Sequence, residues 1–587
     1  MVQGRSATEA QGNGVRQYLQ GWLLVAAALT TAYASAAQPT NVLPVPTDRV
    51  DIFRCDTTYN YTPGNRLGGI VYPSGTVATY GRDANGRVNA ISARSAGQTT
   101  AVPVVSDVTY LPFGPVQDVV YGDGSLTLKR TFDLNYQGTD IQGLGLDLHV
   151  RRDANGNIVA LHEGRFITHA AEQRYRYDAL QRLTDKIGPW GFFSDHYDYN
   201  ATGDRQSRER AGLLTERYTY QPGTHRLGGI ATPGWHGWKT ADVLSDAAGN
   251  IVRMPRQGQA LDLDYAANNR LAQVAKAGRV VGSYVYDANG LRAQKTTSSH
   301  ARQFIYDDQA HLLGDYTPDT QQKREYLWLE GNLVATLDTS ARGVSIHYVG
   351  TDFLGTPRRV VNAGGYPVWG WAYAGEVFGD TPALGSYDLA MRFPGQYHDA
   401  ESGLNYNVHR DYDAATGRYV ESDPIGLRGG LSSYAYVGSN PVNASDLLGL
   451  FHLSRKSGPE GGVWCDHGAW KTWVKVPDQY KSCPQIGICA VAHEQSHIED
   501  VDRDNPGLCH WYSNLIGGLY LAEDTDAEAM ATEYKAFNTE LDCLERLLKQ
   551  EKCEGDGCRP LIEWRESTIK QYYIPKVLGG SYGSVDD

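Results

Sequence analysis

The sequence predicts a multidomain protein in which a β-rich domain of repeated hairpins is followed by a mainly α domain. Three observations support this prediction: a length of 587 residues, a motif that recurs about every twenty residues, and a change of composition near residue 450. One hydrophobic core rarely organises a chain of this length, so we expect several domains. The high content of Gly and Tyr, 65 and 38 residues, favours turn-rich β-structure.

The change of composition separates residues 451–587 from the rest of the chain. This segment holds 7 of the 8 Cys, whereas 31 of the 38 Tyr precede it. Its 14 Lys and Arg against 23 Asp and Glu give it a net charge of −9, out of −13 for the whole chain. The acidic balance argues against nucleic-acid binding through phosphate neutralisation. A hydrophobic fraction of 41% with 21% charged residues excludes a polytopic membrane protein, a coiled coil and a disordered chain.

Residues 1–37 have the pattern of a secretory signal peptide. Arg5 and Arg16 precede an apolar run that begins at Trp22, and small residues follow it up to Ala37. The uncharged run has 17 residues at most, fewer than the roughly 20 that a membrane-spanning helix needs. We predict cleavage after Ala36 and a secreted or cell-envelope protein, in a compartment where disulfides persist. The alternatives are an uncleaved anchor, which would be the chain's only membrane contact, and a buried helix.

A short aromatic motif recurs through residues 38–340. Its copies align on a second aromatic position, occupied by Tyr177, Tyr199, Tyr220, Ser245, Tyr265, Tyr286 and Tyr306. The pattern Tyr-x-Tyr places two aromatic side chains on one face of a strand, and a following Asn-Gly supplies the positive φ angles of a tight turn. Because a lone hairpin is marginally stable, successive copies must pair into one sheet whose buried face is rich in Tyr and Leu.

These hairpin motifs resemble the YD repeats of Rhs (rearrangement hotspot) and related toxin-complex proteins. The resemblance covers roughly residues 50–450 and implies a sheet that spirals into a hollow shell. The alternative is an open repeat sheet or a propeller that binds ligands on its surface. Periodicity alone does not distinguish an open sheet from a closed one.

Residues 341–450 resemble the Rhs-associated core. The motifs that carry this resemblance are Asp352-Phe-Leu-Gly-Thr-Pro-Arg358, Phe393-Pro-Gly-Gln396, Leu404-Asn-Tyr-Asn-Val-His-Arg-Asp-Tyr412, Asp423-Pro-Ile-Gly-Leu427 and Asp446-Leu-Leu-Gly-Leu450. In similar proteins the two Asp-containing motifs act as an aspartyl-type self-protease that cuts after the final Leu, here Leu450. Two carboxylates that share a site split their pKa values and leave one acid and one base to activate water. We therefore expect Asp423 and Asp446 to be catalytic.

One departure from the family pattern affects this prediction. The second motif usually reads Asp-Pro, whereas this chain has Asp446-Leu447, so we expect the local turn to differ. The alternative is that both Asp residues are turn residues, with Asp423 initiating a turn before Pro424.

In the Rhs family the segment after the core is a variable toxin, often an enzyme. Here this segment, residues 451–587, contains the HExxH sequence His493-Glu494-Gln-Ser-His497. On a helix, both imidazoles project from one face and can bind one Zn²⁺, and Glu494 can take a proton from metal-bound water. The resulting hydroxide would attack a peptide bond. The alternatives are two packed histidines or a closed structural zinc site.

A third zinc ligand is expected on the next helix, near residues 526–550. Glu533 lies about 60° from the centre of the apolar stripe of this helix, and a carboxylate beside an apolar face needs a partner such as a metal. The other candidates are Glu528, Asp500, Asp504 and His510. Asp500 and Arg503 stand where a metzincin has Gly and His, so the site resembles that of a gluzincin.

The seven Cys of the tail allow two disulfides, Cys553–Cys558 and Cys509–Cys543, and a structural zinc at Cys553 and Cys558 is an alternative. Together, these features predict an exported Rhs-type toxin whose terminal zinc metallopeptidase acts on a protein or peptide of a competitor or host cell. The family resemblance also implies a cognate immunity protein in the producer. The alternative is a surface-exposed binding or adhesion protein whose terminal domain is inert.

Overall fold

The computed structural model describes residues 56–450, except for residues 113, 165–171, 190–193, 257, 319, 321, 341–342, 374 and 376. Beyond residue 450 it describes residues 453–454, 461–466, 469–474, 538–539 and 543–544. The predicted signal peptide lies outside the described residues.

The first 17 strands form one antiparallel sheet in which each strand pairs with the next in sequence. The strands are β1 (Thr58–Tyr61), β2 (Leu67–Val71), β3 (Val77–Arg82), β4 (Val88–Arg94), β5 (Val102–Tyr110), β6 (Val116–Tyr121), β7 (Leu126–Phe132), β8 (Gly138–Gly143), β9 (Leu146–Arg152), β10 (Ile158–Glu163), β11 (Gln173–Tyr177), β12 (Leu183–Ile187), β13 (Asp195–Tyr199), β14 (Arg205–Arg210), β15 (Leu213–Tyr220), β16 (Leu227–Gly234) and β17 (Gly237–Asp242). Each strand is antiparallel to the next, as the repeats predict.

A second antiparallel sheet of 14 strands continues the same pattern. Its strands are β18 (Leu244–Ser245), β19 (Ile251–Arg256), β20 (Gln259–Tyr265), β21 (Leu271–Lys276), β22 (Arg279–Tyr286), β23 (Arg292–Thr297), β24 (Ala301–Tyr306), β25 (Leu312–Thr317), β26 (Gln322–Leu329), β27 (Asn332–Ser340), β28 (Gly343–Thr351), β29 (Pro357–Asn362), β30 (Pro367–Gly370) and β31 (Leu384–Gly385). The two sheets confirm the predicted β-rich architecture.

The hairpin after β22 shows how one repeat folds. Tyr284 is buried and Tyr286 is partly buried, while Val285 between them is exposed, so both Tyr side chains lie on the inner face. The Asp287 carboxylate accepts N–H bonds from Asn289 and Leu291, both at 2.9 Å, and closes the turn. Only the last turn residue, Gly290, has a positive φ, because a β-bulge beside Tyr286 replaces the two-residue turn that the sequence predicts.

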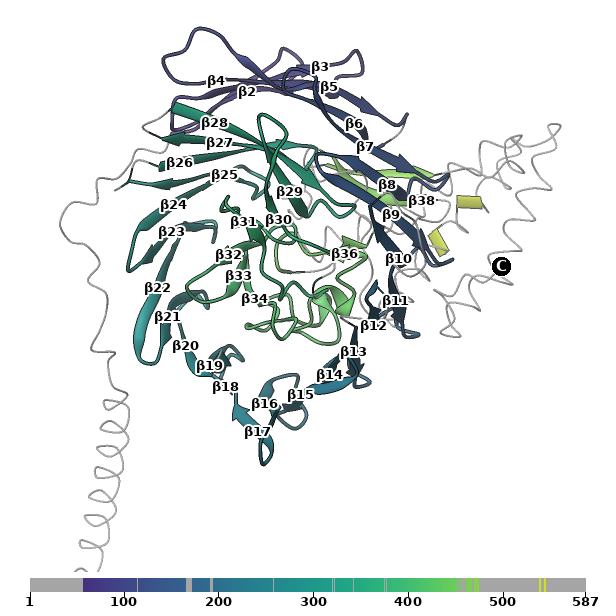
Figure 1. The fold of residues 1–587 in the computed structure, drawn as a ribbon, viewed down its shortest axis with the longest axis vertical. Coiled ribbons are helices and arrows are strands. Elements are labelled where there is room, and N and C mark those ends of the chain that lie inside the picture. The colour runs from purple at the N-terminus through teal and green to yellow at the C-terminus, as the bar shows by residue number, and fades with distance from the viewer. Residues whose placement is uncertain are drawn as a thin grey trace, which may run out of the picture.

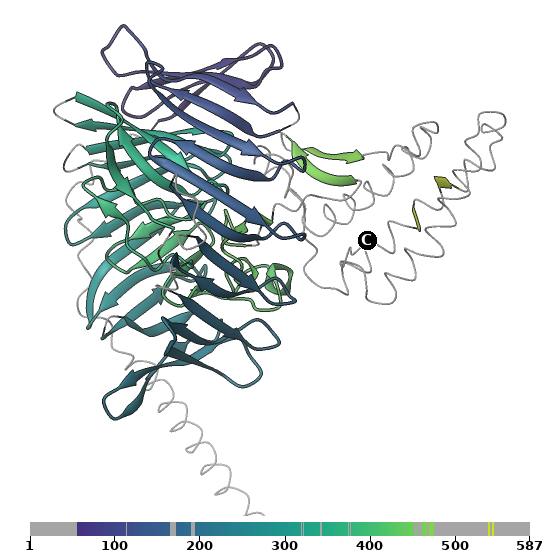
Figure 2. The same ribbon diagram turned by 45° about the vertical axis from the view of Figure 1, so that its right-hand side comes forward.

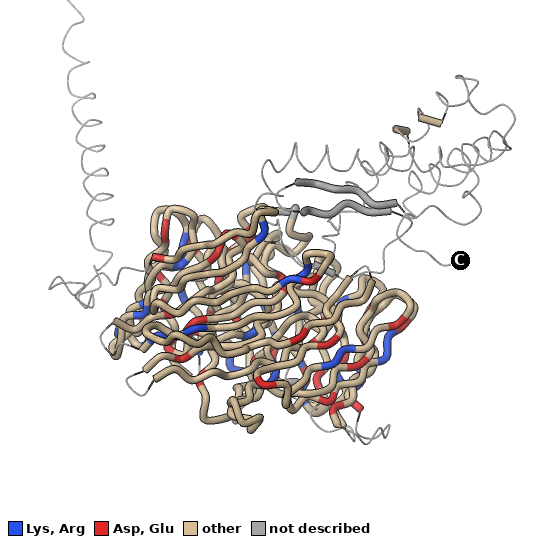
Figure 3. The backbone as a smooth tube through the Cα atoms, turned by 90° about the horizontal axis from the view of Figure 1, so that it is seen from above, with Lys and Arg blue, Asp and Glu red and all other residues tan. Residues whose placement is uncertain are grey.

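The two sheets follow one another around a ring that overlaps itself (Figure 1). Residues of β2–β9 share one buried apolar cluster with residues of β25–β29. Across this overlap the Tyr72 hydroxyl donates to the backbone oxygen of Tyr326 at 3.0 Å, and the Ser74 N–H donates to the Glu325 carboxylate at 3.2 Å. The repeat sheet is therefore closed, which contradicts the open-sheet alternative. Seen from above, acidic and basic residues are interspersed along the strands (Figure 3).

The residues that follow β31 fold into the ring and fill its centre (Figures 1 and 2). This core contains β32 (Tyr397–Asp399), β33 (Leu404–Asn407), β34 (Arg410–Asp413), β35 (Arg418–Tyr419), the 3-10 helices η2 (Gly426–Gly429) and η3 (Val437–Ser439), and β36 (Ala444–Ser445). Its aromatic residues, among them Tyr412, Tyr419 and Tyr436, pack in one cluster with residues of β24–β30.

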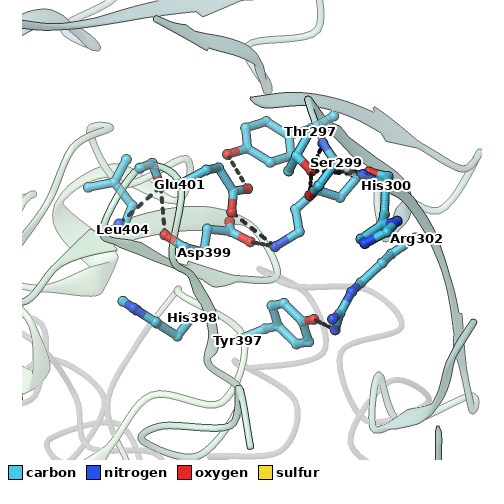
Figure 4. Close-up of polar contacts among 12 residues, drawn as sticks. Thr297, Ser299, His300, Arg302, Tyr397, His398, Asp399, Glu401 and Leu404 are labelled. Atoms are coloured by element: carbon cyan, nitrogen blue, oxygen red, sulfur yellow. Dashed lines mark hydrogen bonds and ion pairs between the residues drawn. The ribbon is translucent and has the colours of Figure 1, made fainter. Parts of the chain in front are cut away.

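Buried ion pairs attach this core to the ring. Asp399 of β32 lies 2.6 Å from Arg292 and 2.8 Å from Lys295, both on β23, and Glu401 lies 3.3 Å from the same lysine. Figure 4 shows Asp399 and Glu401 facing the ring, with the Arg302 side chain of β24 reaching the Tyr397 hydroxyl beside them. In this network the ring supplies the cations and the core supplies the carboxylates, and a pair of opposite sense joins Arg418 of the core to Asp204 of the ring.

The described pieces of the tail begin with β37 (Leu453–Ser454), which pairs with β36. A hairpin of β38 (Gly461–Asp466) and β39 (Ala469–Val474) follows, and residues 538–539 and 543–544 are helical. The mainly α fold expected for residues 451–587 stays a prediction. The hairpin of β38 and β39 shows that this segment also contains β-structure. Cys543 is disulfide-bonded, and its predicted pairing with Cys509, outside the described residues, stays a prediction. Within the described part of the chain, no helix has the length and apolarity needed to span a membrane.

Candidate active site

Asp423 and Asp446 reach the same point of the core from two separate turns. Asp423 follows β35 and opens the turn that leads into η2, where its Oδ1 accepts the N–H of Ile425 at 3.0 Å. Its own N–H donates to the Ser433 carbonyl at 2.8 Å, which fixes the turn against the returning chain. Asp446 directly follows β36. Asp423 is thus a turn residue as well as a candidate catalytic residue, and the two interpretations do not exclude each other.

A single buried guanidinium joins the two carboxylates. The Nη2 atom of Arg410 lies 2.8 Å from Asp423 Oδ2 and 3.4 Å from Asp446 Oδ2. Its Nη1 donates to the Ser433 carbonyl at 3.2 Å, its Nε donates to the Gly449 carbonyl, and its guanidinium stacks 3.7 Å over the Tyr419 ring. One nitrogen in contact with both carboxylates places them in one site, and the remaining contacts fix the guanidinium.

Asp446 holds the backbone that leads to Leu450. Its Oδ1 accepts the N–H groups of Gly449 at 2.8 Å and of Leu450 at 3.1 Å, and its Oδ2 accepts the Tyr419 hydroxyl at 2.7 Å. Asn407 donates to the Asp446 backbone carbonyl at 2.9 Å and to the Tyr419 hydroxyl at 2.8 Å. The Asp446 side chain closes the turn, so the Leu at position 447 does not leave the turn open.

A glycine keeps space between Asp423 and the Leu450 carbonyl. A Cβ atom on Gly429 would lie 2.2 Å from Asp423 Oδ2 and 2.7 Å from the Leu450 oxygen, so both atoms border the same small space. Asp423 Oδ2 is buried and, apart from its contact with Arg410, accepts no hydrogen bond from the described residues. The predicted cleavage position therefore lies beside an oxygen with spare hydrogen-bonding capacity.

Backbone pairing holds the chain on both sides of the predicted cleavage position. Ala444 and Ser445 of β36 pair with Ser454 and Leu453 of β37, so Leu450 lies in the connection between two paired strands. This pairing restricts how far the peptide bond after Leu450 can move from the carboxylates.

Burial dominates the electrostatics of the site. Burial raises the pKa of Asp423 to about 7, against the opposing effect of Arg410 and with a further increase from Asp446. Burial also holds the pKa of Tyr419 well above its usual range, so its hydroxyl remains a donor to Asp446. A carboxyl group that titrates near neutral pH can either donate or accept a proton under working conditions.

Sequence reasoning identified both Asp residues and missed the three side chains that organise them. Arg410 and Asn407 lie in the motif from Leu404 to Tyr412, which served only to mark the resemblance to the Rhs core. A physical signal was available, because two carboxylates buried among aromatic residues need a cation and hydrogen-bond donors.

The predicted zinc ligands His493, His497 and Glu533 and the predicted base Glu494 lie outside the described residues. The same holds for the other candidate ligands, Glu528, Asp500, Asp504 and His510. Within the described part of the chain, no group of three or more His, Cys, Asp or Glu residues could hold a metal ion. The zinc site stays a prediction.

Comparison with known protein families identifies the family to which the ring of strands belongs. Residues 126–428, just over half of the chain, match the family model of the Teneurin YD-shell. The chain belongs to the Teneurin YD-shell family. This confirms the YD-repeat resemblance and the shell fold that it implies.

Several bacterial proteins, two of them toxins by name, are relatives of this YD-shell protein. It is 28% identical over 457 residues to the probable deoxyribonuclease RhsB of Dickeya dadantii (strain 3937), covering 69% of this chain and 29% of the relative. It is 26% identical over 355 residues to the toxin protein Tse5 of Pseudomonas aeruginosa, covering 48% of this chain and 27% of that protein. A double-stranded DNA deaminase toxin A of Burkholderia cenocepacia is 28% identical over 259 residues, covering 43% and 17%. The chain spans less than a third of the length of each of these relatives.

Solved structures show the same YD-shell fold. The crystal structure of TcdB2-TccC3 has a TM-score of 0.52 at 18% identity, and the match covers 67% of this chain and 22% of that one. At this identity the likeness shows the fold alone.

Proposed function

We propose that this YD-shell protein is an Rhs-type toxin whose core cuts the chain after Leu450 and thereby separates a C-terminal enzyme from its shell. The observation that carries the cleavage proposal is the placement of Asp423 Oδ2 beside the Leu450 carbonyl, with Asp446 holding the backbone of the same residue. The two relatives that are named as toxins support the broader assignment.

The two carboxylates take different roles in this proposal. Asp423, with a pKa of about 7, is the acid that protonates the reacting amide, because its Oδ2 lies on the Leu450 side of the site. Asp446 is the base that takes a proton from the attacking water. Arg410 contacts both and stabilises the negative charge that develops in the transition state. The reaction consumes one water and leaves a carboxyl group on Leu450 and a free amine on the next residue.

Three single variants test the cleavage. Asp423→Asn and Asp446→Asn are each expected to leave the chain at full length, while the unchanged protein separates into two fragments on a denaturing gel. Asp204→Asn is the control for the loss of a buried carboxylate, because Asp204 is equally buried but pairs with Arg418 at 3.4 Å and not with Arg410. If the Asp204 variant also fails to cut, loss of folding explains the result and the assignment of the two catalytic Asp residues fails.

The separated tail, residues 451–587, is proposed to be a zinc peptidase of the gluzincin type. The support is the HExxH spacing of His493, Glu494 and His497, with Glu533 as the third ligand. One relative is named as a deaminase and another as a probable deoxyribonuclease, so another toxin chemistry is the competing proposal for the tail. The family match ends at residue 428, before the HExxH motif, and does not bear on this choice.

Growth and metal content distinguish these proposals. The full chain is expected to slow the growth of cells that lack its immunity protein and to contain about one zinc per molecule. Glu494→Gln should abolish the toxicity and retain the metal, because the residue is a base and not a ligand. Glu499→Gln, in the same segment but outside the motif, is the control. Toxicity that survives Glu494→Gln would favour a nuclease or deaminase, and absence of toxicity from the unchanged chain would favour a binding or adhesion protein.

A further inference from the structure

The outer half of the hairpin formed by β16 and β17 leaves the sheet. The pairing of β15 with β16 ends at Arg217 and Ala231, whereas β16 and β17 continue to pair up to Gly234 and Gly237. Beyond Ala231, β16 therefore pairs with β17 alone among the strands that the structure describes. This outer half, residues 232–240, is the hairpin tip, and it projects from the ring at the bottom of Figure 1.

The hairpin is anchored at its base and exposed at its tip. Leu227, Ile230 and Val243 at the base are buried in one apolar cluster with residues of β19–β22. Every residue from 232 to 240 is exposed. The alternation of buried and exposed positions that is typical of a strand packed on a core thus stops at Ala231, and the hairpin tip rests on no core.

Two tryptophans lie on the hairpin tip. Trp235 stands in the two-residue turn and is 96% exposed, and Trp238 on β17 is 39% exposed. A ring as exposed as that of Trp235 adds nothing to the packing of the shell. Because an indole is apolar with a single N–H donor, tryptophan is enriched where an apolar phase meets water, as at the surface of a bilayer.

The charge around the hairpin tip is positive although the chain is acidic. Residues 217–241 contain no Asp or Glu, whereas the whole chain has a net charge of −13. Lys239 and Arg217 are exposed, and the Arg217 guanidinium lies 4.3 Å from the centre of the Trp238 ring. Aromatic rings flanked by cations are complementary to a surface that has anionic headgroups above an apolar interior.

The hairpin tip is small for a protein partner. A stable protein–protein interface buries roughly 1,200–2,000 Å² in total and needs a partner of matching shape. A single two-stranded tip with two large side chains offers no such area. A bilayer needs no matching shape, because its headgroups and acyl chains rearrange around an inserted ring.

We propose that the hairpin tip inserts Trp235 and Trp238 into the headgroup region of an anionic lipid bilayer and docks the shell on that membrane. Arg217 and Lys239 contact the lipid phosphates, while the buried base of the hairpin stays in the shell. Two rings and two cations give a reversible, salt-sensitive attachment and not an anchor. This contact is separate from the predicted N-terminal segment and independent of cleavage in the core.

Flotation with lipid vesicles tests the proposal. The protein without residues 1–36 is used, so that the apolar run of the predicted signal peptide does not contribute. It should float with vesicles of phosphatidylcholine and phosphatidylglycerol in equal parts, and much less with phosphatidylcholine alone. Trp235→Ser should weaken binding at least about tenfold, because a large apolar side chain then no longer enters the bilayer. Leu134→Ser is the control, since Leu134 is 99% exposed at another turn and should not affect binding.

Fluorescence locates the contact on the hairpin tip. Vesicles with brominated acyl chains should quench the tryptophan fluorescence of the unchanged protein more than that of the Trp235→Phe protein. The Trp235→Ser protein should keep the unfolding temperature of the unchanged protein, because the ring packs on no core. Equal flotation of the unchanged and Trp235→Ser proteins, or equal quenching with and without Trp235, would overturn the proposal. So would a Trp235-dependent rise of mass with protein concentration in the absence of flotation, which would show a second copy as the partner.

Discussion

We expect titration of Asp423 to make the free energy of unfolding depend on pH, and we expect the variant Asp423→Asn to lack this dependence. Its pKa is about 7 in the folded protein against an ordinary 3.8, and the largest cause is burial. Because the folded chain binds this proton more tightly than the unfolded chain, the stabilisation is fully present below about pH 4 and is lost as the pH rises through 7. One pKa unit corresponds to about 1.4 kcal/mol, so the shift predicts a loss of about 4 kcal/mol in total.

The comparison is made in an Asp446→Asn background so that neither protein is cut. Between pH 5 and pH 8 the free energy of unfolding of the protein with Asp423 should fall by up to about 3 kcal/mol more than that of the Asp423→Asn protein, because Asn at position 446 removes only the smallest of the causes that raise the pKa of Asp423. Urea unfolding followed by tryptophan fluorescence at both pH values measures this difference. If the difference between the two proteins is the same at pH 5 and pH 8, Asp423 does not titrate between them and the account of the acid is refuted.

Three further predictions concern the site and its support. Burial and Asp411 raise the pKa of Glu421 to about 8. Because Gln resembles the neutral carboxyl group, Glu421→Gln should raise the unfolding temperature at pH 9 and leave it nearly unchanged at pH 5. An equal effect at both pH values would contradict this assignment. Arg292→Met leaves Asp399 without its 2.6 Å partner and should lower the free energy of unfolding in urea by about 3–5 kcal/mol. Arg253→Met, at the exposed pair with Asp262, should lower it by less than about 1 kcal/mol. Similar losses in the two variants would contradict the importance of burial. Gly429→Ala fills the space between Asp423 and the Leu450 carbonyl and should slow cleavage about 100-fold in a time course; an unchanged rate would show that this space is not used.

The repeat unit of the fold was predictable because its signal is local. Tyr284 and Tyr286 flank one strand position and Gly290 ends the turn, so the sequence spacing defines the hairpin. The ring closure was not predictable, because it depends on contacts such as Tyr72 with Tyr326, which lie 254 residues apart. The turns also differ from the Asn-Gly turn that the sequence predicts. In their repeats, the turn position of Gly290 is occupied by other residues that adopt the same positive φ, namely Gln181, Asn269 and Ala310. A carboxylate cap from the preceding Asp closes the turns that contain Gln181 and Ala310 without a glycine.

The candidate site was predictable in its reacting groups and not in their arrangement. Asp423 and Asp446 stood out through the family motifs, but nothing in their spacing shows that Arg410 contacts both or that Gly429 leaves space beside Leu450. These features arise from packing between segments that the sequence separates. The single departure at Leu447 suggested a different turn, and the structure shows that the Asp446 side chain closes this turn on its own.

The most direct test of the central claim is the intact mass of the purified protein. The account predicts two species after denaturation, with the C-terminal one beginning at Phe451 and comprising 137 residues. Asp423→Asn and Asp446→Asn proteins should each give one species of full length. A single full-length species from the unchanged protein, or a cut at any other bond, would contradict the claim that this core cleaves its own chain after Leu450.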